Sequence, residues 1–190
     1  MSYNHHLERN NDHPLVKAVK KDNVSDLIHF FTIGKNSYAN KFDVQSLDNF
    51  AIKHASYLGN QEMVEYLISE GADVDAENSL SVTFASSQNH MKVLQLLFTQ
   101  KIDIKKNKSA LNLACRHGHF DIVKFLISKG ASITNDILII TAYHGHLDIV
   151  KYLVSEGADI SHYNYYALEV ALKNGHQKVA DYLIDMQQYI

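Results

Sequence analysis

GHFDIVKFLISKGASI (118–133) and GHLDIVKYLVSEGADI (145–160) are nearly the same peptide, and this duplication decides the fold of the 190-residue chain. Further copies are GNQEMVEYLISEGADV (59–74), NHMKVLQLLFTQKIDI (89–104), the shorter GHQKVADYLIDM (175–186) and the divergent DNVSDLIHFFTIGK (22–35). The first residues of successive copies are 37, 30, 29, 27 and 30 residues apart. Self-similarity at a period near 30 residues indicates a stacked repeat architecture.

Two columns of turn-forming residues define the unit. The first residue of each copy is glycine, asparagine or aspartate, and these residues enter the left-handed region of backbone space most easily. This column predicts a tight turn between two helices. Twelve residues later, four of the six copies have glycine, which predicts a helix C-terminus. Lys101 occupies that second column and would cost about 1 kcal/mol if it were left-handed.

The residues between the two columns have the pattern of an amphipathic helix. Ile149, Val150, Leu153 and Val154 are spaced i, i+1, i+4, i+5, which places them on one face. A shorter helical stretch precedes each turn, and Ser109 and Asp136 are the predicted N-caps of two such stretches. A unit of this size cannot bury its apolar face alone, so the units must stack.

The unit resembles the ankyrin repeat, TPLHLAARNGHLEIVKLLLEAGADVNA, most closely at 109–133, 136–160 and 166–184. The chain is also similar to the ankyrin-repeat proteins of mimivirus-like giant DNA viruses, which infect amoebae. The resemblance implies an all-α solenoid of about six helix-turn-helix units with short finger loops. The expected divisions are a tail at 1–12 and repeats at about 13–49, 50–79, 80–108, 109–135, 136–165 and 166–190.

The composition narrows the function. With 18 basic and 21 acidic residues, the net charge is -3, so no strong cationic field is available to bind a polyanion. The longest apolar run, 137–140, is too short to cross a bilayer, and the polar N-terminus lacks a secretory segment. These features predict an intracellular, cytoplasmic protein, in the host cell if it is viral, without membrane contact.

Neither a metal site nor an active site is predicted. The twelve histidines include His119 and His146, but these hold one repeat position, so we expect them to form structural hydrogen bonds at the start of the outer helix. The single cysteine, Cys115, aligns with a buried alanine of the family pattern and should be inert. The sequence contains no G-x-S-x-G, phosphate-binding glycine loop or HExxH stretch. We therefore expect no enzymatic activity, no cofactor and no small-molecule substrate.

The resemblance implies a non-catalytic protein-interaction module that binds a protein partner through its concave groove and finger loops. In such arrays the two residues before each inter-helix turn and the finger tips contact the partner. On this chain, these positions give the following candidate partner-binding residues: Tyr57, Leu58, Arg116, His117, Tyr143, His144, His162, Tyr163 and Tyr165.

Two alternatives remain open at this stage. One is a self-assembling structural component, with the chain a monomer or a weak homodimer. The other is nucleic-acid binding through the lysines of one finger, Lys101, Lys105, Lys106 and Lys108. Phosphate binding generally needs a broader basic face, which disfavours the second alternative.

Overall fold

The computed structural model describes residues 17–18, 20–26, 28–29 and 46–188. These residues form helices joined by turns and short loops, and no strand occurs among them, which confirms the all-α prediction. The chain divides into an N-terminal unit, which extends to Ile102, and a C-terminal unit, which begins at Asp103. The expected tail at 1–12 and most of the first expected repeat lie outside the described residues.

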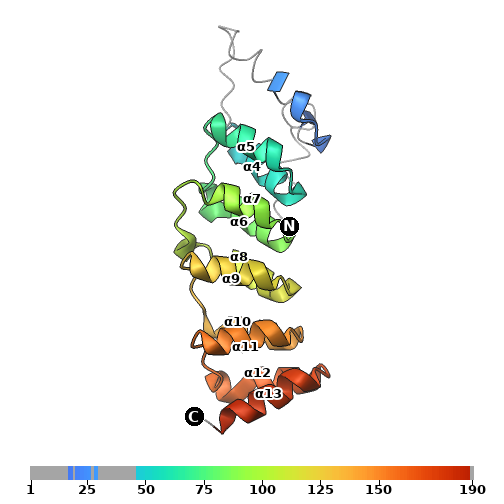
Figure 1. The fold of residues 1–190 in the computed structure, drawn as a ribbon, viewed down its shortest axis with the longest axis vertical. Coiled ribbons are helices and arrows are strands. Elements are labelled where there is room, and N and C mark those ends of the chain that lie inside the picture. Colours follow the sequence, from blue (N-terminus) through green and yellow to red (C-terminus); the bar gives the residue numbers. More distant parts are fainter. Residues whose placement is uncertain (1–16, 19, 27, 30–45, 189–190) are drawn as a thin grey trace. The chain divides into compact units, whose positions relative to one another are not determined.

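Two antiparallel helix pairs make up most of the described N-terminal unit (Figure 1). Their inner helices, α4 and α6, pack against each other, and so do the outer helices, α5 and α7. Their bounds are α4 (Ser46–Leu58), α5 (Gln61–Ser69), α6 (Ala76–Ser87) and α7 (Met91–Leu97). The arrangement buries the apolar face that each pair has in common.

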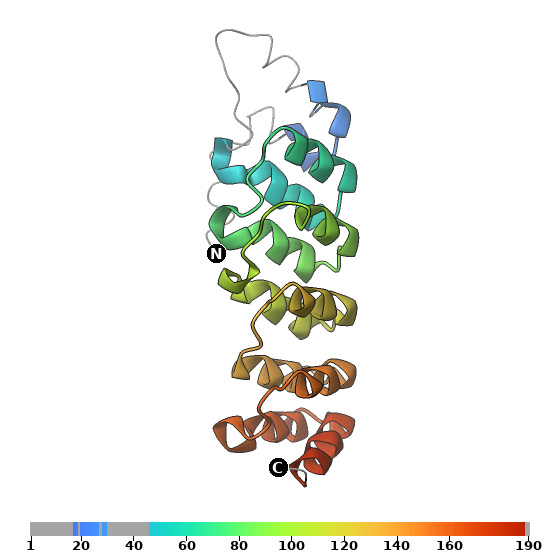
Figure 2. The same ribbon diagram turned by 60° about the vertical axis from the view of Figure 1, so that its left-hand side comes forward.

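Three helix pairs follow one another in sequence order in the C-terminal unit (Figure 2). The inner helices pack as α8 on α10 and α10 on α12, while the outer helices pack as α9 on α11 and α11 on α13. The bounds are α8 (Lys108–His117), α9 (Phe120–Ser128), α10 (Asn135–Tyr143), α11 (Leu147–Ser155), α12 (His162–Lys173) and α13 (Gln177–Gln187), with a 3-10 turn η1 (Ile104–Lys106) before them.

The first turn column is left-handed in every copy, as the sequence predicts. Its φ values lie between 53° and 78°: Asp22, Gly59, Asn89, Gly118, Gly145 and Gly175. In the second column Gly71, Gly130 and Gly157 are left-handed as well, whereas Lys101 is not. The helix α7 ends at Leu97, before this column, so no left-handed lysine is required.

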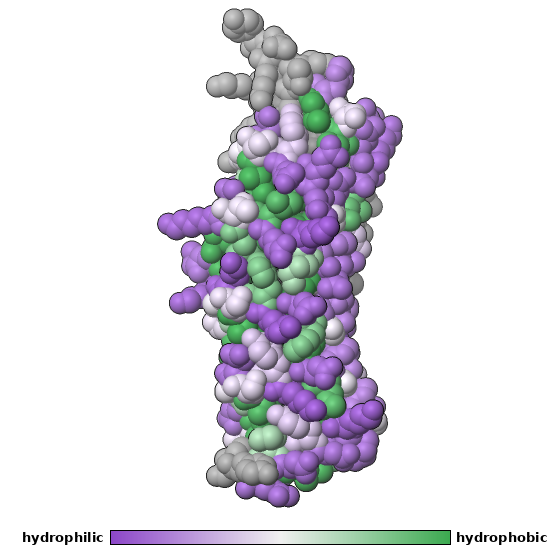
Figure 3. All heavy atoms as spheres, viewed as in Figure 1, coloured by the Kyte–Doolittle hydropathy of each residue, from purple (hydrophilic) through white to green (hydrophobic). Residues whose placement is uncertain are grey.

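The predicted apolar face of the outer helices forms the core. Ile149, Val150 and Leu153 are buried in α11, and Val154 is half-buried. The opposite face of the outer helices is solvated: in α9 the Asp121 carboxylate pairs with the Lys124 ammonium at 3.1 Å, and both side chains are exposed. Figure 3 shows hydrophilic and hydrophobic side chains interleaved on the visible face.

Both predicted N-caps are wrong by two positions. Asn107, rather than Ser109, caps α8, because its side-chain oxygen accepts a hydrogen bond from the Ala110 N–H at 2.9 Å. Thr134 occupies the cap position of α10, and Asp136 is the second residue of that helix. Asparagine is as good a cap as serine, so the helix begins at the earlier residue where both are available.

Candidate functional site

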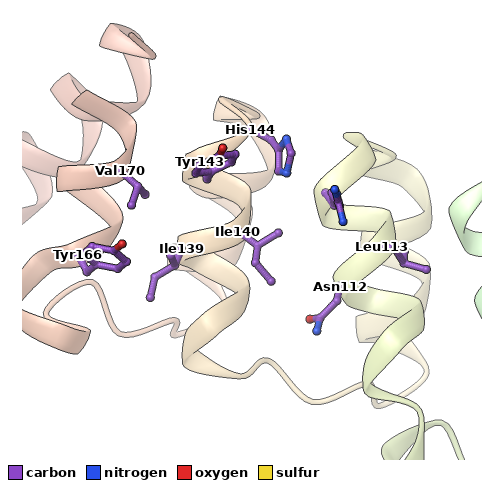
Figure 4. Close-up of a pocket in the computed structure, with 9 residues that line it drawn as sticks. Asn112, Leu113, Ile139, Ile140, Tyr143, His144, Tyr166 and Val170 are labelled. Atoms are coloured by element: carbon purple, nitrogen blue, oxygen red, sulfur yellow. The ribbon is translucent and has the colours of Figure 1, made fainter. Parts of the chain in front are cut away.

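An open pocket of about 410 Å³ lies along the inner helices α8, α10 and α12 of the C-terminal unit. Most of its lining is apolar or aromatic, with one amide, one imidazole and one guanidinium (Figure 4). The lining residues are Asn112, Leu113, Arg116, Ile139, Ile140, Tyr143, His144, Tyr166 and Val170. A mostly apolar concavity with a few placed polar groups is the usual form of a binding site. We call it the inner-helix groove.

The apolar floor of the groove comes from an unusual helix. In α10, Ile137 and Leu138 are buried in the core, whereas Ile139 and Ile140 are half-buried and line the groove. The helix is therefore apolar on both its core side and its groove side. An occupant that covered the groove side would gain about 25 cal/mol for each apolar Å² that it removed from water.

Histidines of the following repeat hold the helix ends that carry the groove residues. The His146 Nε2–H donates to the Arg116 carbonyl at 3.0 Å, and the His176 Nε2–H donates to the Tyr143 carbonyl at 2.9 Å. His90 makes the same bond to Tyr57 in the N-terminal unit, at 3.0 Å. The hydrogen-bonding role predicted for this histidine column is confirmed for His90, His146 and His176, and each acceptor lies in the preceding repeat. These hydrogen bonds fix the last turns of α8 and α10 relative to the following repeat.

The charged side of the groove is cationic. Arg116 is exposed, and no acidic side chain is among the lining residues. Burial lowers the pKa of His144, and the nearby Arg116, His146, His117 and His176 lower it further. Because the ordinary pKa of histidine is already below 7, the His144 imidazole is neutral at neutral pH. Its ring lies edge-to-face with Tyr143, with a centroid separation of 5.0 Å.

One polar atom in the lining has no partner. The Asn112 side-chain oxygen is buried and accepts no hydrogen bond from the part of the chain that the structure describes. Figure 4 shows the Asn112 side chain on α8 directed toward the space between α8 and α10. An unsatisfied buried acceptor costs about 1–3 kcal/mol, so the groove gains if an occupant supplies a donor.

The structure brings three of the sequence-predicted candidates together, since Arg116, Tyr143 and His144 all line the groove. His117 lies next to Arg116 but stacks on His119, with ring centroids 5.8 Å apart, and does not line the groove. Tyr57 and Leu58 lie at the end of α4 in the N-terminal unit. Both side chains are exposed, and the Tyr57 ring meets Phe84 edge-to-face at 6.0 Å.

The candidates of the last finger lie at the start of α12, outside the groove lining. The His162 Nδ1 accepts a hydrogen bond from the Asn135 side chain at 3.1 Å. Tyr163, Asn164 and Tyr165 are all left-handed, with φ between 48° and 61°, so the right-handed part of α12 begins only after them. The Tyr163 ring is 68% exposed and the Tyr165 side chain is half-buried.

Sequence reasoning missed six lining residues: Asn112, Leu113, Ile139, Ile140, Tyr166 and Val170. The sequence signal for two of them was the run Ile137–Ile140, because four consecutive apolar residues cover more than one face of a helix. The others follow from inner-helix packing, which the family pattern of turn and finger residues does not contain.

Three other features were considered in the sequence: metal ligands, membrane-spanning segments and the finger lysines. No three of their histidine, cysteine, aspartate or glutamate side chains converge as metal ligands would. None of their helices combines the length and apolar character needed to span a membrane. Of the finger lysines in the C-terminal unit, Lys105 and Lys108 are exposed, and Lys106 pairs with Asp103 at 3.4 Å. Lys101 belongs to the N-terminal unit.

The Cys115 thiol is buried in α8, and burial raises its pKa from 9.0 to about 12 despite an opposing hydrogen bond with Thr141. The thiolate is the reactive form, so the raised pKa and the buried position both slow the reaction of the native chain. We expect the native chain to react with Ellman's reagent at pH 8 at least about a hundredfold more slowly than the urea-unfolded chain. Absorbance of the released thiolate measures both rates, and equal rates would contradict the buried position.

The comparisons with known proteins agree with the helix pairs. A family model described as ankyrin repeats (3 copies) matches residues 54–137 and 111–190. An ankyrin repeat protein of Acanthamoeba polyphaga mimivirus is 32% identical over 106 residues, which are 55% of this chain and 18% of that protein. A second ankyrin repeat protein of the same virus is 28% identical over 85 residues, which are 45% of this chain and 18% of its own length.

A similar segment occurs in an animal protein. The ankyrin repeat and KH domain-containing protein mask-1 of Caenorhabditis elegans is 33% identical over 88 residues, which are 43% of this chain and 3% of that protein. The chain thus matches less than a fifth of the length of each of these curated relatives. With the repeated helix pairs, the left-handed turn column and a family match over more than half of its residues, the chain belongs to the ankyrin-repeat family.

Proposed function

We propose that the chain is a non-catalytic binding module that holds a protein partner in the inner-helix groove of its C-terminal unit. Ankyrin repeats are generally protein-interaction modules and are typically non-catalytic. The observation that carries the proposal is the groove itself, a concavity of about 410 Å³ with a mostly apolar and aromatic lining. Tyrosine and arginine are enriched among the residues that dominate binding energy, and Tyr143, Tyr166 and Arg116 line it.

The proposal gives each kind of lining residue a role. Ile139 and Ile140 offer apolar surface for a side chain of the partner, while Tyr143 and Tyr166 supply rigid rings that lose little entropy on burial. The module then acts by occupancy, as ankyrin-repeat modules typically do. The Cys115 thiol, next in sequence to the groove residue Arg116, is buried in α8, and its raised pKa keeps it protonated.

The test is affinity capture from the native cell with two matched double variants. Arg116→Ala with Tyr143→Ala removes two groove side chains, whereas Asp148→Ala with Lys178→Ala removes two exposed charges from the outer helices. We expect the groove variant to lose the partner, with a loss of at least about tenfold in recovery, and the outer variant to retain it. Circular dichroism must show both variants folded, and undiminished capture by the folded groove variant would contradict the proposal.

A further inference from the structure

The groove combines a cationic edge with an apolar floor, and we infer that its occupant is an acidic peptide segment of the partner, with an aspartate or glutamate beside an apolar side chain. The inference rests on the proposed function and adds the chemistry of the partner. It follows from three separate features of the groove: its charge, its apolar surface and its unsatisfied acceptor.

The charge comes from Arg116, which is the only charged side chain in the lining. His144 lines the groove beside it, and His117 on α8 together with His146 and His176 at the following turns lies close enough to act on His144 electrostatically. Each of these groups lowers the pKa of His144 and none of them is acidic. On α12, Glu169 is exposed and does not line the groove, and the lining contains no carboxylate. A guanidinium fork with no carboxylate beside it in the groove lining fits a carboxylate from outside.

The apolar surface and the unsatisfied acceptor fix the rest of the segment. Ile139 and Ile140 are half-buried on α10; Ile140 is directed toward α8, the helix that carries Arg116, and Ile139 toward α12 (Figure 4). An apolar side chain adjacent to the acidic residue would reach this floor. The buried Asn112 oxygen accepts no bond from the described residues and would accept a backbone N–H of an extended peptide. A nucleic acid would supply the negative charge but not the apolar side chain.

His144 makes the binding sensitive to pH. In the free protein its pKa is lowered by burial and by Arg116, His146, His117 and His176. A bound carboxylate acts in the opposite direction and raises that pKa, so the complex takes up protons. Affinity for an acidic segment therefore increases as the pH falls from 7.5 to 6.0, whereas affinity for a neutral segment does not.

The experiment uses the full chain and three pools of N-acetylated, C-amidated octapeptides. Each pool places leucine, isoleucine or phenylalanine next to one variable position, which is aspartate or glutamate in the first pool, asparagine or glutamine in the second and lysine in the third. Peptides retained by the immobilised chain are identified by mass spectrometry. The best acidic peptide is then measured by calorimetry at both pH values in two buffers of different ionisation enthalpy, which gives the number of protons taken up.

We expect the acidic pool to be enriched and each amide counterpart to bind at least about tenfold more weakly. Arg116→Gln should abolish that preference, Arg116→Lys should retain part of it, and the outer-helix control Lys178→Gln should leave it unchanged. Affinity should rise about threefold or more between pH 7.5 and pH 6.0, with net proton uptake. Asn112→Leu should weaken binding without lowering thermal stability, because it removes an unsatisfied acceptor from the folded chain.

The failures can be told apart. Equal enrichment of the acidic and amide pools, both lost in Tyr143→Ala, would overturn the acidic inference and leave the groove as the binding site. No enrichment of the acidic pool would also overturn the inference, while the capture experiment decides separately on the proposed function. Displacement of the acidic peptide by a mixed-sequence 12-nucleotide single strand at a lower concentration than by unlabelled peptide would overturn it in favour of nucleic acid.

Discussion

Replacing Gly145 with alanine should destabilise the C-terminal unit by about 2–5 kcal/mol, measured as the free energy of unfolding in urea. Gly145 has a φ of +77°, where a side chain costs about 1–2 kcal/mol. A Cβ at this position would also lie 2.6 Å from Cε1 of His176, a ring that is held by its hydrogen bond to the Tyr143 carbonyl. The ring would have to move and break that bond, and the clash adds the cost of overpacking.

Gly175 is the matched control. Its φ is +76°, but a Cβ there would meet no atom within 4 Å. We expect Gly175→Ala to cost only the backbone term of about 1–2 kcal/mol. In a His176→Ala background, Gly145→Ala should fall to the same value, since the ring is gone. Equal costs for Gly145→Ala and Gly175→Ala in the unmodified chain would contradict the close approach of the two repeats.

The two sides of α10 should respond differently to the same substitution. Ile137 is 1% exposed, and Ile137→Ala should cost about 2–5 kcal/mol because it leaves a cavity in the core. Ile140 is half-buried on the groove side, and Ile140→Ala should cost about 1 kcal/mol or less, because alanine has the higher helix propensity and water fills the space. Urea denaturation of both variants gives the comparison.

Binding should show the reverse order. Ile140→Ala removes part of the groove floor and should weaken partner capture, whereas Ile137→Ala should leave capture intact at temperatures where the variant is folded. If Ile140→Ala is as destabilising as Ile137→Ala, then Ile140 belongs to the core, and the groove floor has been assigned to the wrong side chains.

The fold could be predicted because the repeat places its signals in the sequence itself. Alignment of the copies predicts Asp22 and Asn89 in the turn column, and both are left-handed, like the glycines of that column. The core face of the outer helices followed from periodicity in the same way. Helix starts were less predictable: both Asn107 and Ser109 can cap α8, and only the geometry of the Ala110 N–H decides between them.

The candidate site was predictable at its edge but not at its floor. Arg116, Tyr143 and His144 precede the turn glycines, so the family pattern identified them. Periodicity could not assign Ile139, Ile140 and Val170 to the groove. When a helix has apolar residues on several sides, the sequence does not show which side packs in the core and which side lines a groove. The hydrogen bond from His176 to Tyr143 was predicted in kind, but its acceptor depends on how one repeat packs on the next.

Binding in the inner-helix groove is tested most directly by methyl NMR of the full chain with ¹³C-labelled isoleucine δ1 groups, titrated with the captured partner or the best acidic peptide. We expect the Ile139 and Ile140 signals to shift, while the signal of Ile184, which is 41% exposed on α13, stays in place. A shift of Ile184 with Ile139 and Ile140 unchanged would place the binding surface on the outer helices and rule out the groove.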